Sequence, residues 1–138
     1  MNISSILGVS SIGKLNAYCA SKFAVRCLTE LLQMEALADF PYVIVCVVHS
    51  GGINTAIANN AIHFDGRNEN IRQQEMKTFK KQPTMTPIKT ANIIVNGILN
   101  DKTRILIELD AKLMDWIVRI FPAKYSILVL KQIKKRGL

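Results

Sequence analysis

The chain has 138 residues, the size of one domain that can bury a core of its own. Hydrophobic residues make up 49% of it and charged residues 20%, which argues against a disordered protein. The net charge of +8 is compatible with nucleic acid, an anionic membrane or an anionic cofactor. Nucleic acid is the least favoured of these, and we expect none, because aromatic residues are few and form no stripe with basic residues.

The cysteines and histidines suggest neither disulfides nor a metal site. Cys19, Cys27 and Cys46 are an odd number without CxxC spacing, which predicts reduced thiols in a cytoplasmic protein. His49 and His63 have no second ligand at a metal spacing, so we expect no metal and interpret His49 as a turn residue. We also expect no signal peptide, and no window reaches the ~20 apolar residues of a spanning helix.

The first part of the chain is predicted to form a strand, a helix and a second strand. Ile3 lies in a short strand, and residues 16 to 39 follow a helical period that ends before Pro41. The run from Tyr42 to Val48 lacks alternation and is rich in β-branched residues, as in strands buried on both faces of a parallel sheet. The apolar stripe of this helix is formed by Ala17, Ala20, Ala24, Cys27, Leu28, Leu31 and Ala38. Its polar stripe is formed by Tyr18, Lys22, Arg26, Glu30 and Gln33.

A polar segment and a second helix come next. Residues 59 to 83 carry scattered charges and a candidate short helix over 69–81, which is typical of a lid rather than of a core. Thr86 and Pro87 are then predicted to be the N-cap and first residue of a helix that ends near Leu99.

The last part is predicted to form a strand and a helical tail. The strand covers residues 104 to 108, and the tail, residues 111 to 138, is one or two helices broken at Pro122. The order β–α–β–α–β–α predicts an α/β fold: a partial Rossmann-like, doubly wound parallel sheet with helices on both faces. We assign residues 1–110 to this unit and 111–138 to an amphipathic basic tail.

Three residues in the first strand and helix carry a chemical signal. Ser5 precedes Tyr18 by thirteen positions, and Lys22 follows Tyr18 by four, which places the last two on one helix face. Reduction of a carbonyl needs a proton donor, and a tyrosine can serve when a nearby ammonium lowers its pKa from ~10. A serine hydroxyl can hold the substrate oxygen beside it. An isolated Tyr-x-x-x-Lys would more simply be a solvated helix face, so the surrounding pattern decides.

That surrounding pattern is compound. It comprises Asn2-Ile-Ser-Ser with Gly8, Ala20-Ser21 between the tyrosine and the lysine, and Gly51-Gly52-Ile53-x-Thr55 after the buried strand. From residue 2 to about residue 111 the chain thus resembles the C-terminal half of the short-chain dehydrogenase/reductase family. The resemblance implies an NAD(P)-dependent oxidoreductase with an alcohol or carbonyl substrate and with Ser5, Tyr18 and Lys22 as catalytic residues.

The resemblance also implies how the cofactor, NAD or NADP, is held. Tyr18 and Lys22 would lie against its nicotinamide end, with Lys22 on the ribose hydroxyls. After the second strand, Gly51 would line the turn, Ile53 would contact the carboxamide through its backbone, and Thr55 would approach the carboxamide or the pyrophosphate.

The chain departs from the family pattern in two places. Ser50 stands where the family's turn usually has a proline, which loosens that turn. None of the seven glycines forms the glycine-rich nucleotide loop that follows a first strand in this family. We therefore expect a truncated member, inactive by itself, whose choice between NAD and NADP the sequence does not settle.

Two alternatives remain open. The first is a non-catalytic remnant that self-associates as a homo-oligomer, pairs with a complementing chain or attaches to a membrane surface. The second concerns residues 113 to 136, whose apolar face beside a basic end suggests peripheral membrane contact. A helix packed on its own sheet or on a subunit partner is the competing explanation for that tail.

Overall fold

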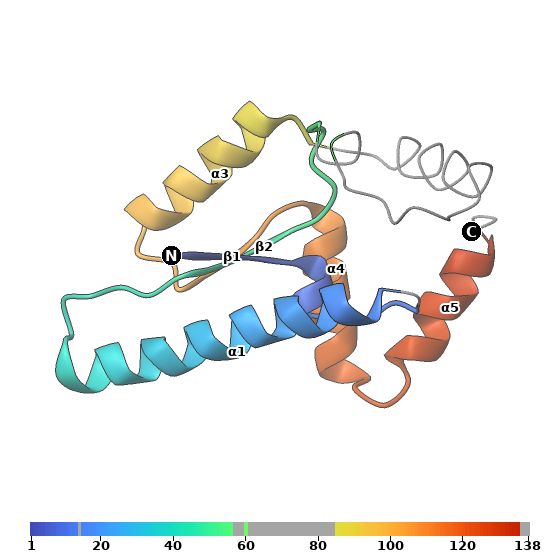
Figure 1. The fold of residues 1–138 in the computed structure, drawn as a ribbon, viewed down its shortest axis with the longest axis horizontal. Coiled ribbons are helices and arrows are strands. Elements are labelled where there is room, and N and C mark those ends of the chain that lie inside the picture. Colours follow the sequence, from blue (N-terminus) through green and yellow to red (C-terminus); the bar gives the residue numbers. More distant parts are fainter. Residues whose placement is uncertain (14, 57–59, 61–84, 136–138) are drawn as a thin grey trace.

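A parallel sheet carries the fold of this computed structural model, which describes residues 1–13, 15–56, 60 and 85–135 (Figure 1). Within these residues the strands β1 (Asn2–Ser5), β2 (Val47–Ser50) and β3 (Arg104–Leu106) lie side by side in chain order. Both pairings are parallel, so the carboxyl ends of β1 and β2 meet, with Ser5 opposite Ser50. The predicted α/β architecture with a parallel sheet is confirmed.

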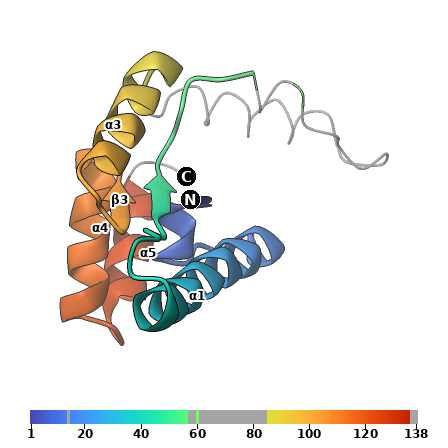
Figure 2. The same cartoon turned by 90° about the vertical axis from the view of Figure 1, so that its left-hand side faces the viewer.

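Helices cover both faces of the sheet, with α3 (Pro87–Leu99) on one side and α1 (Asn16–Asp39) on the other (Figures 1 and 2). A 3₁₀ turn, η1 (Ile6–Gly8), follows β1 directly. After β3 come α4 (Leu109–Ile120) and α5 (Tyr125–Lys135), which confirms the predicted break of the tail at Pro122. No helix among the described residues is long and apolar enough to span a bilayer.

The α3 side of the sheet holds the hydrophobic core. Buried Cys46, Val48, Ile105 and Ile107 pack together there, against Ile93 and Ile94 of α3 among others. As predicted, Thr86 caps α3: its hydroxyl accepts a hydrogen bond from the backbone of Lys89 at 3.4 Å, with Pro87 in the first turn.

The α1 side of the sheet is polar instead. The Asn2 amide donates to the Thr29 hydroxyl at 3.1 Å, and the Ser4 hydroxyl donates to the Lys22 carbonyl at 2.9 Å. These bonds offset the cost of burying polar groups between a sheet and a helix.

The orientation of α1 differs from what its periodicity predicts. Cys19, Thr29 and Ala36 are buried, with Thr29 against Asn2 of the sheet, whereas the predicted apolar stripe is exposed. On this side of the sheet Asn2 and Ser4 find hydrogen-bond partners in the Thr29 side chain and the Lys22 backbone of the helix. The exposed leucines and methionine of the helix's second half form what we term the α1 apolar face: Leu28, Leu31, Leu32, Met34 and Leu37.

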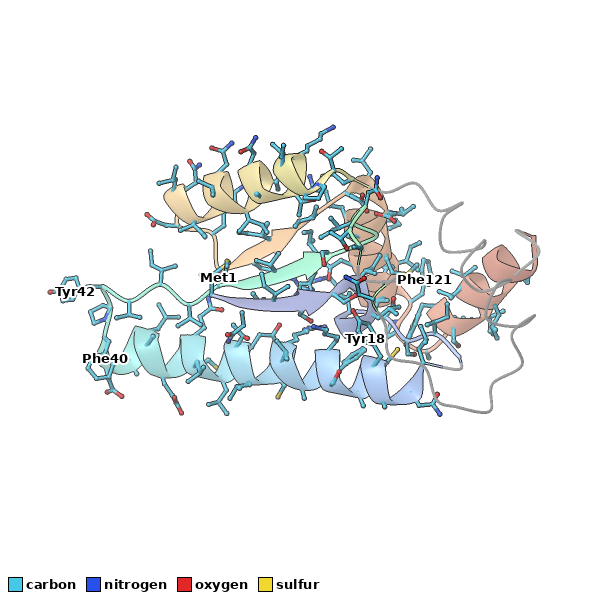
Figure 3. All side chains as sticks on the ribbon, turned by 45° about the horizontal axis from the view of Figure 1, so that its top comes forward. Met1, Tyr18, Phe40, Tyr42 and Phe121 are labelled. Atoms are coloured by element: carbon cyan, nitrogen blue, oxygen red, sulfur yellow. The ribbon has the colours of Figure 1, made fainter. Side chains whose placement is uncertain are left out.

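The second strand is shorter and later than predicted. It begins at Val47 rather than Tyr42, and the Tyr42 side chain is 96% exposed at the far end of the molecule (Figure 3). The pairing explains this, since Asn2, the first residue of β1, lies opposite Val47 and leaves residues 42–45 without a neighbouring strand. His49 is a fully buried strand residue, so its interpretation as a turn residue is wrong. The predicted lid lies almost wholly outside the described residues, as does His63.

Candidate active site

Tyr18 and Lys22 lie together on α1, one helical turn apart. The Lys22 ammonium nitrogen is 5.7 Å from the centroid of the Tyr18 ring, within the range of a cation–π contact. The same ammonium donates to the Ile3 carbonyl at 3.3 Å, which ties the lysine to β1. Tyr18 is 46% exposed and lies on α1 near the carboxyl ends of the strands (Figure 3). A ligand arriving at this end of the sheet can therefore reach its phenol.

Ser5 ends β1 and begins η1. Its hydroxyl accepts a hydrogen bond from the Leu7 backbone at 3.1 Å and faces the Ser50 carbonyl at 3.4 Å, to which it donates. Within the described part of the chain, no hydrogen bond joins this hydroxyl to Tyr18 or Lys22. The structure thus pairs Tyr18 with Lys22 and fixes Ser5 at the adjoining strand end, with its side chain committed to the turn and to β2.

A glycine lets α1 approach η1 closely enough to place Lys22. A side chain at Gly8 would collide with the Ser4 hydroxyl and with the backbone carbonyl of Lys22. These are the two groups that hydrogen-bond to each other at 2.9 Å. Gly8 and Ser4 together therefore set the position of α1 along β1.

The turn after β2 leaves the same edge of the sheet as the Ser5 turn. Ile53 forms a parallel bridge with Met85, in which Met85 donates to Gly52 at 3.0 Å and Asn54 donates to Met85 at 2.9 Å. The Thr55 amide donates to the Ile53 carbonyl at 2.9 Å. These bonds hold the turn while using peptide groups other than the Ile53 N–H.

Glu108 and Asp110 are site-edge residues that the sequence reasoning missed. The Glu108 carboxylate lies against Gly51, where a Cβ atom added to this glycine would collide with it. Burial, and then the charge of Asp110, raise the pKa of Glu108, while a hydrogen bond from the Met85 backbone opposes the rise. The signal available in the sequence was two carboxylates directly after a strand, at its carboxyl end.

His49 is a third residue that was missed. Its Nδ1 lies 3.0 Å from the Ser5 carbonyl oxygen, and the ring is fully buried. Burial lowers the pKa of His49; the charges of Arg104 and Arg26 act in the same direction, while the Ser5 hydrogen bond and Asp115 act against it. The sequence signal was a histidine that directly continues an apolar, β-branched run.

Comparisons with known proteins indicate the family of this chain. A family model described as short chain dehydrogenase matches residues 1–65. The chain is 38% identical over 138 residues to SadH of Mycobacterium tuberculosis, a protein named as an oxidoreductase. The match covers 98% of this chain and 48% of SadH. It is 37% identical over 83 residues to a 3-ketodihydrosphingosine reductase of Bacteroides thetaiotaomicron, which corresponds to 58% of this chain and 30% of that one.

The fold comparison gives the same result. A short-chain dehydrogenase from Streptomyces avermitilis superimposes with a TM-score of 0.66 at 23% identity, over 99% of this chain and 51% of that one. The chain thus spans about half the length of the proteins it matches. With the sequence match, the parallel sheet and the Tyr18–Lys22 helix in agreement, the chain belongs to the short-chain dehydrogenase/reductase family.

Proposed function

We propose that this chain carries the acid–base centre of an NAD(P)-dependent oxidoreductase that interconverts an alcohol and a carbonyl. Tyr18 donates a proton to the carbonyl oxygen during reduction and accepts it during oxidation. The Lys22 ammonium stabilises the phenolate that Tyr18 forms on donating. Ser5 holds the substrate oxygen near the phenol once its hydroxyl turns from Ser50, the longer of its two contacts.

One observation carries this proposal. An exposed phenol and an ammonium share one face of α1, and the ammonium is also bonded to the strand that ends in Ser5. A merely solvated helix face would leave the lysine free to extend into water, which the side-chain entropy of lysine favours. Here the lysine is folded back against the sheet and the tyrosine.

The residues at the second turn fit a nicotinamide cofactor. The Ile53 N–H lies between the peptide groups that bond to Met85 and is not used by those bonds, so it can donate to a carboxamide oxygen. Gly51, Thr55 and Lys22 would hold the rest of the nicotinamide end. When bound, the cofactor supplies or accepts the hydride; the chain's own residues orient the substrate oxygen and move its proton.

The test measures cofactor binding and carbonyl reduction by the purified chain. The purified chain is assayed for NADH and NADPH binding by cofactor fluorescence. It is then assayed for reduction of aldehydes and ketones, with and without the half of SadH that this chain does not match. The panel includes a long-chain 3-ketone, because one relative is named for reducing such a group.

Tyr18→Phe is expected to lower turnover by about 10²–10⁴-fold. Tyr42→Phe, at the far end of the molecule, serves as the control and should leave turnover unchanged. An absence of cofactor binding with and without the SadH half, or equal turnover of the two variants, would overturn the proposal.

We further propose that the protein associates with another polypeptide, either a second copy or a complementing chain. The α1 apolar face supports this, because several large apolar side chains exposed together on one helix are a recurrent mark of protein interfaces. The open edge of β1, where Met1 and Ile3 are exposed, offers a second surface for pairing.

The three free thiols support a cytoplasmic location.

A further inference from the structure

Helix α4 carries a hydrophobic stripe that faces solvent. Leu109, Leu113, Trp116 and Ile120 recur at intervals of four, three and four residues, which places them on one side of the helix. Their exposed fractions lie between 47% and 83%. The opposite side is anchored in the protein, since Ala111 is fully buried there. We refer to these four residues as the α4 stripe.

The charges around the α4 stripe are mostly basic. Of the two acidic residues in α4, Asp115 is bound to Arg104 and Arg119 and is largely buried. Lys112 is exposed within the stripe's span, and Lys124 is exposed in the turn that follows the helix. Asp110, in the first turn, is the remaining acidic residue.

Helix α5 extends the same combination of apolar and basic residues. Ile127, Leu128 and Leu130 are exposed, and exposed Lys131 follows them. The sequence then continues with Lys134, Lys135 and Arg136. The start of α5 is fixed to the body by a 2.8 Å hydrogen bond between the hydroxyls of Tyr125 and Ser11. The start of α5 is thus attached to the segment that contains Ser11, which follows η1.

We propose that α4 and α5 dock on the surface of an anionic membrane. An exposed apolar stripe with a tryptophan and flanking lysines is suited to the boundary between acyl chains and headgroups. The lysines attract anionic lipid, in keeping with the net charge of +8. A second copy is a poorer occupant, because a symmetric contact would bring the lysines of both copies together. The α1 apolar face is a separate surface, on a different helix.

The protein offers a direct probe of this docking, because Trp116 is its single tryptophan. The full chain is mixed with vesicles of phosphatidylcholine alone, or of equal parts phosphatidylcholine and phosphatidylglycerol, and its tryptophan emission is recorded. Docking predicts a blue shift and protection from acrylamide quenching with the anionic vesicles, both weakened by added salt. The measurement needs neither cofactor nor substrate, so its failure is distinct from a failure of the proposed function.

Two matched leucines locate the contact. Leu113→Glu, on the stripe, is expected to weaken vesicle binding at least about tenfold. Leu99→Glu makes the same change at an exposed leucine of α3, outside the α4 stripe and the α1 apolar face, and should bind like the wild type. Circular dichroism of both variants shows whether the helices remain. Lys112→Gln and Lys124→Gln should each weaken binding to anionic vesicles about fivefold, whereas Lys102→Gln, after α3, should not.

Three results would overturn the proposal. The first is unchanged Trp116 emission with anionic vesicles. The second is equal binding by the two leucine variants. The third is a blue shift that grows with protein concentration in the absence of lipid, which would show that a second copy covers the stripe.

Discussion

The buried imidazole of His49 donates a hydrogen bond to the carbonyl oxygen of Ser5 across 3.0 Å. A carbonyl only accepts, so a proton lies on Nδ1, and burial lowers the pKa of the ring and thereby favours its neutral form. The Nε2 of this ring has no hydrogen-bond partner among the described residues. A histidine of β2 thereby fixes the peptide group of the candidate catalytic serine in β1.

Stability should fall as the pH drops below about 6.5. Burial lowers the pKa of His49 in the folded state below 6.5, the ordinary value for histidine, so the unfolded chain takes up a proton before the folded chain does. The contribution of His49 is thus fully present above pH 6.5 and is lost as pH falls toward the folded-state pKa. The slope is at most about 1.4 kcal/mol per pH unit for one proton.

NMR titration of the two histidines checks this prediction together with urea unfolding between pH 5 and pH 8. His49 should keep the Nδ1–H tautomer and remain neutral through pH 6.5. His49→Gln, which does not titrate, should flatten the dependence of unfolding free energy on pH. A His49 resonance that titrates at or above 6.5 would show that burial does not dominate the pKa of this residue.

Replacing Gly8 should disturb the contact between α1 and β1. In Gly8→Ala the added methyl group meets the Ser4 hydroxyl and the Lys22 carbonyl, and the carbonyl belongs to a rigid helix backbone. We expect a loss of about 1–3 kcal/mol in the free energy of unfolding, as for overpacking elsewhere. Gly13→Ala is the matched control, since a methyl group there meets nothing within 4 Å. Similar losses in both variants by chemical denaturation would count against the proposed spacing role.

Glu108→Gln should stabilise the protein at neutral pH. Burial and the nearby Asp110 raise the pKa of Glu108 above 4.5, the ordinary value for glutamate, so the folded state disfavours the charged form. The favourable contribution of the protonated acid is present below pH 4.5 and is lost as pH rises through the folded-state pKa. The glutamine should therefore gain stability at pH 7, and the gain should shrink toward pH 4.

Thermal unfolding of Glu108→Gln beside Glu35→Gln measures this effect. Glu35 is an exposed glutamate of α1 and should respond little at either pH. A glutamine at position 108 that destabilises the protein at pH 7 would mean that the hydrogen bond from Met85 outweighs burial and repulsion.

The α1 apolar face should make the protein self-associate or pair. Met34→Lys places a charge within that face and should shift sedimentation-velocity profiles toward the monomer, because burying the lysine would cost more than the contact returns. Ile88→Lys, at an exposed position of α3, is the control and should leave the profile unchanged. A wild-type protein that sediments as a monomer at every concentration, alone and with the unmatched half of SadH, would exclude this association.

Much of the candidate site was predictable because it depends on local spacing. The interval of four residues between Tyr18 and Lys22 places both on one helix face whatever surrounds them, and the bounds of α1 follow from its period and from Pro41. The cap at Thr86 and Pro87 is equally local. The pattern of serine, tyrosine, lysine and paired glycines was sufficient to indicate the family.

The tertiary structure decided everything that depends on pairing between distant segments. The register of β1 against β2 determines where β2 begins, buries His49 and places it against Ser5. The side of α1 that faces the sheet receives hydrogen bonds from Asn2 and Ser4 of β1, and the period of α1 did not predict that side. The contact of Glu108 with Gly51 joins residues 57 positions apart. Sequence periodicity reports one segment at a time, whereas these contacts arise between segments that are distant in the sequence. The Tyr18–Lys22 pair could therefore be inferred from the sequence alone, but the contacts that surround it could not.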